Sequence, residues 1–301
     1  MPDRPPLAVL HDRALGAYLG LALGDALGAT VEFMTAGEIA ARHGVHRQIS
    51  GGGWLKLAPG QVTDDTTMAL ALGDALIEGR HSGAGFETRR VADHFVRWWR
   101  GKPVDCGNTC RRGIQRYLAD GSLEGPPSDG DAGNGAAMRN LPVVLATLDT
   151  SDETALQAQS LAQARLTHHH PWSDAATLAL ARLVRALLLG QGERCEALAV
   201  ELVAQHAVFR FKPYPGRASA FVVDTMQTVL HHYFAHEDFE AALVATVNRG
   251  DDADTTGALV GMLAGARCGA AALPAHWLRR LDPQVRRAIT EQTSSLLACT
   301  P

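Results

Sequence analysis

Apolar residues recur at intervals of three and four along most of the chain, which is the pattern of helices with one buried face. Leu, Ala, Arg, Glu and Gln, all good helix formers, dominate these segments. The pattern predicts helices at residues 11–27, 64–78, 86–100, 107–119, 135–148, 152–166, 174–189, 194–207, 217–235, 238–248, 255–270 and 283–297. Alternation with a period of two is nearly absent, and its one instance, residues 208–212, is too short for a sheet.

Three segments, residues 43–62, 120–134 and 210–217, do not fit a helical pattern. Long irregular loops in a compact helical protein often carry function. Apolar helices resume directly on either side of each loop, so none has the character of a domain linker. We therefore expect a single, compact all-α domain over residues 1–301, with frayed ends at 1–10 and 298–301.

Small residues mark close packing and helix ends. Gly257, Gly261 and Gly265 are spaced by four, which indicates that another helix approaches this face closely. Three residues mark expected helix ends: an N-cap at Ser173 and, just beyond C-terminal ends, Gly79 and Gly190.

The composition excludes several classes of protein. The chain has 301 residues, is 46% hydrophobic and 20% charged, and has a formal net charge of −4, which excludes intrinsic disorder and disfavours a nucleic-acid binder. No apolar run reaches the ~20 residues of a transmembrane segment, and the N-terminus does not resemble a signal peptide. Five scattered cysteines, including Cys106 and Cys110, form neither a disulfide framework nor a zinc motif. We expect a soluble, cytoplasmic protein with reduced thiols.

Acidic residues cluster at two expected helix starts, Thr63-Asp64-Asp65-Thr66 and Asp251-Asp252-Ala253-Asp254-Thr255. Helix capping explains one acid per helix, but not several beside apolar residues that are expected to be buried. Carboxylate and hydroxyl oxygens suit a hard divalent cation such as Mg²⁺, Mn²⁺ or Ca²⁺. If the two starts converge, they supply enough oxygen ligands for a site with two metal ions. The alternative is a helical protein whose acids only cap helices.

Two further motifs are weaker alone. Gly133-Asn134-Gly135 closes a loop and precedes an expected helix, so its backbone could approach a phosphate, or it could be only a tight helix entry. Three consecutive histidines, His168, His169 and His170, cannot all face one ligand. His168 is the simplest candidate for a single functional histidine.

Taken together, and in the order in which they occur along the chain, these motifs resemble those of the ADP-ribosylglycohydrolase family. The resemblance runs from about residue 13 to 270 and rests on residues 20–28, Glu32, Thr63–Thr66, Gly133–Gly135 with Met138-Arg139, Thr167-His168 and Asp252–Thr255. Residues 52–55, 104–109 and 220–228 resemble the subfamily that removes ADP-ribose from an arginine of the nitrogenase iron protein (dinitrogenase reductase). The resemblance implies a metal-dependent N-glycosidic hydrolase with two Mn²⁺ or Mg²⁺ ions in a central cleft. It also implies regulation by a PII-type signalling protein and reversible membrane association through an ammonium transporter.

The resemblance also implies roles for individual residues. The metal ligands would be Thr63, Asp64, Asp65, Asp252, Asp254 and Thr255, and Glu32 would touch the metal or the reacting water. The residues near the substrate would be Asp105 and Asn108 at the scissile bond, Gly133, Asn134, Gly135 and His168 on ADP-ribose, and Tyr214 at the adenine.

The chemistry implied is hydrolysis at the anomeric carbon through an oxocarbenium-like transition state. Glu32 would position or deprotonate the water, Asp105 would hold the guanidinium leaving group, and the loop at Asn134 would hold the diphosphate through backbone N–H groups. Two other functions stay open. The enzyme could hydrolyse another ADP-ribosyl bond, to serine, an acetyl group or a nucleobase. The chain could also be a non-catalytic member that binds ADP-ribose.

Overall fold

A computed structural model describes residues 5–149 and 152–298, and these residues form helices joined by loops. No strand occurs among them, and only three isolated β-bridges are present. The α-helices are α1 (Leu7–Gly28), α2 (Ala36–His43), α3 (Asp64–His81), α4 (Thr88–Arg100), α5 (Asn108–Asp120), α6 (Leu141–Ala146), α7 (Thr154–Arg165), α8 (Pro171–Leu188), α9 (Cys195–Gln205), α10 (Val222–Ala235), α11 (Phe239–Val247), α12 (Ala253–Cys268), α13 (Ala275–Leu278) and α14 (Pro283–Leu297). The all-α expectation is confirmed.

The main differences from the expected helices have local causes. Residues 135–139 form turns, and α6 begins only at Leu141, because Pro142 is tolerated in a first turn but not inside a helix. Likewise α8 begins at Pro171, with His170 rather than Ser173 as its N-cap. Gly190 does follow the C-terminal end of α8.

Gly79 lies inside α3 rather than beyond it. A Cβ atom there would lie 2.2 Å from the carbonyl oxygen of Gly85, so this glycine permits close packing. The expected frayed ends are only partly described, since residues 7–10 belong to α1 and residues 1–4 and 299–301 lie outside the described part.

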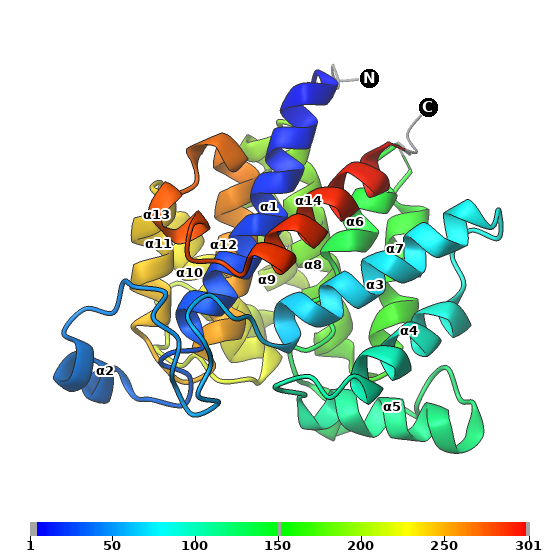
Figure 1. Cartoon of the computed structure of the whole chain (residues 1–301), viewed down its shortest axis with the longest axis horizontal. Coiled ribbons are helices and arrows are strands. Elements are labelled where there is room, and N and C mark those ends of the chain that lie inside the picture. Colours follow the sequence, from blue (N-terminus) through cyan, green and yellow to red (C-terminus); the bar gives the residue numbers. More distant parts are fainter. Residues whose placement is uncertain (1–4, 150–151, 299–301) are drawn as a thin grey trace.

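Helices α1 and α12 run side by side through the middle of the molecule and make its most extensive helix–helix contact (Figure 1). Their contact is a glycine seam, made of Gly16, Gly20, Gly24 and Gly28 of α1 and Gly257, Gly261 and Gly265 of α12. A Cβ atom on Gly20 would lie 2.1 Å from the carbonyl oxygen of Gly261, so the two backbones touch directly. The close approach inferred from the α12 glycines is confirmed.

The seam is antiparallel, which places the C-terminal end of α1 beside the N-terminal end of α12. A Cβ atom on Gly28 would lie 2.2 Å from the carbonyl oxygen of Ala253, the first residue of α12. The acidic motif at residues 252–255 is therefore fixed against the last turn of α1.

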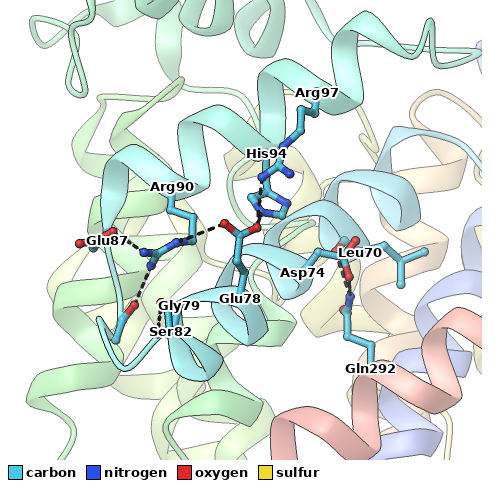
Figure 2. A network of polar contacts seen from close by, with 11 residues as sticks. Leu70, Asp74, Glu78, Gly79, Ser82, Glu87, Arg90, His94, Arg97 and Gln292 are labelled. Carbon is cyan, nitrogen blue, oxygen red and sulfur yellow. Dashed lines mark hydrogen bonds and ion pairs between the residues drawn. The ribbon is translucent and has the colours of Figure 1, made fainter.

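Helix α3 is held along its length by polar contacts with its neighbours, α4 and α14 (Figure 2). Glu78 lies 2.8 Å from Nε2 of His94 and 3.3 Å from Nη2 of Arg97, both on α4. From α14, Gln292 donates to Oδ1 of Asp74 at 2.9 Å. These contacts fix the direction of α3 and hence the position of its acidic N-terminal end.

None of the helices in residues 5–149 and 152–298 combines the length and apolarity that a membrane span requires. The four described cysteines form no disulfide.

Candidate active site

The two acidic motifs meet in space, although about 190 residues separate them in the chain. The Thr63 hydroxyl donates to Oδ2 of Asp254 at 3.4 Å, and the Thr255 hydroxyl donates to Oδ2 of Asp65 at 3.1 Å. Asp64 lies beside them at the first position of α3, and Asp252 is the N-cap residue of α12. The structure thus brings together all six residues that the sequence marks as metal ligands.

Glu32 completes this acidic cluster, which we define as Glu32, Thr63, Asp64, Asp65, Asp252, Asp254 and Thr255. Glu32 follows the end of α1, is only 5% exposed, and offers a carboxylate oxygen within 4.8 Å of oxygens from Asp252 and Asp254. The indole Nε1 of Trp54 donates to its Oε2 at 2.7 Å. Trp54 is itself half exposed and lies against Phe33, which is also exposed.

Burial makes the charges of this cluster costly. Removal from water and, second, the neighbouring carboxylates raise the pKa of Asp64 to about 7. Burial likewise raises the pKa of Glu32 to about 8, against the hydrogen bond from Trp54, which lowers it. The pKa values of Asp65 and Asp254 lie well above normal for the same reasons.

The donor set fits a hard cation. Every candidate ligand atom is a carboxylate or hydroxyl oxygen. Oδ1 of Asp65 is buried and has no hydrogen-bond partner among the residues that the structure describes. A divalent cation would satisfy that oxygen and balance the cluster's negative charge.

Asp25 of α1 is a site residue to which sequence reasoning assigned no role. Its buried carboxylate accepts from the backbone N–H groups of Thr63 and Thr66 at 2.9 and 3.1 Å, and from the Thr66 hydroxyl at 2.6 Å. The side chain of Thr63 makes no capping bond, so a residue of another helix caps α3. An aspartate within the apolar run of residues 21–27 is the signal that could have indicated it.

The cluster opens into a cavity of about 550 Å³. The sequence-predicted residues that line it are Glu32, Asp64, Asp105, Asn108, Gly133, Asn134, Gly135, His168, Asp252, Asp254 and Thr255. Thr63 and Asp65 lie behind this surface, fully buried against α1 and α12. Phe33 and Trp54 stand at the same cavity.

Asn134 contacts the acidic cluster directly. Its side-chain amide donates to Oδ2 of Asp252 and to the hydroxyl of Thr225. Its backbone N–H donates to the carbonyl oxygen of Ala220, so this N–H is not free for a phosphate. The expected helix entry at Gly135 is wrong, because turns follow it. Asn134 therefore orients Asp252, a role that the sequence did not indicate.

The structure separates the three consecutive histidines. His168 lines the cavity, and its Nδ1 lies 2.7 Å from the hydroxyl of Thr167. His169 contacts the carbonyl oxygen of Gly125 through Nδ1, and His170 caps α8. Only His168 of the three faces the cavity.

Asp105 and Asn108 lie on the wall that leads into α5. The N–H of Gly107 donates to Oδ2 of Asp64 at 3.0 Å, which ties this wall to the acidic cluster. Burial raises the pKa of the Cys106 thiol to about 12 and of the Cys110 thiol to about 11, so neither is a ready nucleophile.

Tyr214 is not among the residues that line the cavity. Its ring stacks on His231 with centroids 4.4 Å apart, and the Arg249 guanidinium lies 5.5 Å from its centroid. Its hydroxyl is 2.9 Å from that of Thr228. These intramolecular contacts involve the ring that the resemblance places at the adenine, and that role stays a prediction.

Comparison with known proteins identifies the family to which the chain belongs. The ADP-ribosylglycohydrolase family model matches residues 6–300. The chain is 56% identical over 290 residues to the ADP-ribosyl-[dinitrogen reductase] glycohydrolase of Rhodospirillum rubrum, which covers 96% of this chain and 97% of that protein. It is 32% identical to the ADP-ribosylarginine hydrolase Tri1 of Serratia proteamaculans (strain 568), over 91% of this chain and 76% of that one. A solved ADP-ribosylglycohydrolase-related protein complex superposes with a TM-score of 0.83 at 34% identity, covering 98% of this chain and all of that one.

Proposed function

The chain belongs to the ADP-ribosylglycohydrolase family, and we propose that it removes ADP-ribose from a modified arginine of dinitrogenase reductase, the nitrogenase iron protein. The reaction is hydrolysis of the N-glycosidic bond between the ribose and the guanidinium. The identity to the Rhodospirillum rubrum enzyme along nearly the whole chain supports this substrate, and the name of the Tri1 relative supports an arginine linkage.

One observation carries the proposal: two acidic helix starts converge at the base of a 550 Å³ cavity. A fold in which acids only cap helices needs no such meeting. In addition, α3 is capped by Asp25, which leaves its own acids available for another role.

We propose that the acidic cluster holds two divalent ions, Mn²⁺ ahead of Mg²⁺. Thr63, Asp64 and Asp65 would supply ligands from one side, and Asp252, Asp254 and Thr255 from the other. The number of oxygen donors and the unpartnered Oδ1 of Asp65 support the assignment. Such ions bind sugar hydroxyl groups and make hydroxide available near neutral pH.

The protein's own groups then orient the reactants. Glu32, held by Trp54, positions the attacking water and accepts its proton. The guanidinium is cationic before cleavage, so it needs a carboxylate partner rather than a proton in order to depart. The C–N electron pair goes to its nitrogen, and the neutral guanidine then takes up the proton that the water released to Glu32. The Asp105 carboxylate lines the cavity on the α5 side and is that carboxylate partner.

The cellular setting belongs to the same proposal. A cytoplasmic location, control by a PII-type protein and reversible membrane association through an ammonium transporter are supported by the subfamily resemblance. Co-purification with each partner, with and without ammonium, tests this part separately.

The decisive assay incubates the protein with ADP-ribosylated iron protein, with and without Mn²⁺, and measures free ADP-ribose. Metal-dependent release is expected, and Asp252→Ala should abolish it while the helical circular dichroism is kept. Asp251→Asn is the matched control. Asp251 is exposed and adjoins Asp252, so the Asp251→Asn protein should keep wild-type activity. Turnover on serine, acetyl or nucleobase adducts in place of the arginine adduct would reject the proposed substrate.

A further inference from the structure

The imidazole of His168 is held by a short chain of polar contacts that runs away from the cavity. The Thr167 hydroxyl lies 2.7 Å from Nδ1 of His168, and Nη2 of Arg139 donates to the same hydroxyl at 2.8 Å. All three residues are buried, and Arg139 is fully so.

Arg139 forms no ion pair with a carboxylate of the residues that the structure describes. Its Nε donates to the side-chain oxygen of Gln163 at 2.8 Å, and its Nη2 also donates to the backbone carbonyl of Gln163 at 2.9 Å. The guanidinium lies 4.6 Å from the ring centroid of Phe95, and its Nη1 reaches the sulfur of Cys110 at 3.5 Å. A guanidinium only donates hydrogen bonds, so the Thr167 oxygen must be the acceptor in their contact.

The direction of the remaining bond follows. The Thr167 hydrogen can point to Nδ1 of His168 at 2.7 Å or to the carbonyl oxygen of Ala164 at 3.5 Å, which is at the limit of a hydrogen bond. The short contact is the better bond, and it makes Nδ1 an acceptor. Burial, and then the Arg139 and Arg112 charges, hold the pKa of His168 well below normal. The imidazole is therefore neutral with its proton on Nε2.

The other edge of the ring faces the cavity. A Cβ atom on Gly133 would lie 3.1 Å from Nε2, and one on Gly135 would lie 2.9 Å from Cε1. The glycines of the Gly133-Asn134-Gly135 motif thus leave room for this imidazole. No hydrogen bond within the described residues satisfies Nε2, which lines the cavity as an unused donor.

We propose that Arg139 and Thr167 are positioning residues that hold His168 as a neutral imidazole and aim its Nε2–H into the cavity. The donor would bind an oxygen acceptor of the ADP-ribose ligand. The identity of this ligand rests on the proposed function, whereas the assignment of the His168 tautomer does not.

The tautomer is measured first, on the full-length protein. Long-range ¹H–¹⁵N correlation spectra of ¹⁵N-histidine-labelled protein at pH 7 report which ring nitrogen is protonated, and His168→Gln identifies the signal among the 13 histidines. The expected result is a neutral Nε2–H form. An Nδ1–H form or a charged ring at this pH would overturn the proposal without any variant.

Two substitutions at Thr167 then test the positioning role. Thr167→Val removes the hydroxyl with little change of shape, so the His168 signal should move toward a mixture of tautomers. Thr167→Ser keeps the hydroxyl and should give the wild-type signal. An unchanged tautomer in a folded Thr167→Val protein would refute the role of Thr167.

Binding of free ADP-ribose in the presence of Mn²⁺, followed by calorimetry, measures the consequence. Thr167→Val and His168→Gln should each weaken binding by about tenfold, while Thr167→Ser should stay within about twofold of wild type. Wild-type protein that binds no ADP-ribose would contradict the proposed function, whereas the spectra would still decide the tautomer. Full affinity in Thr167→Val would contradict the positioning role alone.

Discussion

The glycine seam between α1 and α12 offers a test that separates stability from function. Gly24→Ala and Gly265→Ala place the same methyl group at opposite ends of one seam. In each case the new Cβ would lie 2.0 Å from a backbone carbonyl oxygen of the partner helix, well inside the ordinary contact limit of 3.4 Å. Both clashes are with backbone, so no side-chain rotation relieves them and the helices must separate by more than an ångström.

The two variants should be destabilised to a similar extent. Overpacking on this scale costs up to about 3 kcal/mol, and the better helix propensity of alanine returns about 1 kcal/mol. The net loss of about 2 kcal/mol corresponds to about 3 °C in the melting temperature of a chain this long. Differential scanning calorimetry of the metal-free proteins measures this decrease in melting temperature.

Their metal affinities should differ. Gly24 adjoins Asp25 and packs against Gly257, one turn from Asp254, so separation there moves the α12 acids away from those of α3. Gly265 lies about 16 Å along the helix from Asp254. Because metal–ligand distances tolerate only a few tenths of an ångström, Gly24→Ala should weaken Mn²⁺ binding by tenfold or more.

Gly265→Ala should retain the wild-type Mn²⁺ affinity to within about twofold, measured by calorimetric titration. Equal Mn²⁺ affinity in the two variants would refute the claim that the seam sets the geometry of the acidic cluster. Wild-type stability in both would refute the packing argument itself.

Three further predictions follow from the site. Without metal, the pKa values of Glu32 (about 8) and Asp64 (about 7) exceed the value of about 4 in an unfolded chain, so the folded state binds more protons. The melting temperature measured in EDTA should therefore fall as pH rises from 4 to 8, and Mn²⁺ should remove this pH dependence. A melting temperature that rises with pH in EDTA would contradict the raised pKa values. Trp54→Phe removes the hydrogen bond that lowers the Glu32 pKa, so the acid limb of the kcat profile should move upward by about one pH unit. Asp105→Asn should slow hydrolysis of the arginine adduct by at least about tenfold with Mn²⁺ affinity nearly unchanged, and equal losses would make Asp105 structural.

The helical fold was predictable because the spacing of apolar residues within each segment indicates a helix. Periodicity located most helices to within a few residues, and the four-residue spacing of Gly257, Gly261 and Gly265 indicated close packing. Errors arose where one residue overrides a propensity. Pro142 prevents a helix from starting at residue 135, and Pro171 moves the start of α8 ahead of Ser173.

The acidic cluster was predictable for a different reason. Several acids beside buried apolar residues conflict with burial energetics, and a shared cation is the simplest resolution. The contacts that orient these acids were not predictable, because they join distant segments. Asp25 caps a helix 38 residues away, and Asn134 bonds Asp252 across 118 residues. Nothing local in the sequence indicates either pairing.

The contacts of Tyr214 could not be read from the sequence. Its position in a Pro-Gly loop gives no information about His231 and Arg249, which lie against its ring, and its role toward an adenine stays a prediction. His168 is the simplest candidate from the sequence, and the fold places it at the cavity while His169 and His170 lie elsewhere.

The most direct test of the central claim is anomalous diffraction from crystals grown with Mn²⁺. The account predicts two peaks between the start of α3 and the start of α12, roughly 2.0–2.6 Å from carboxylate oxygens of Asp64, Asp65, Asp252 or Asp254. Ordered carboxylates with no peak between them, or manganese bound only elsewhere, would contradict it.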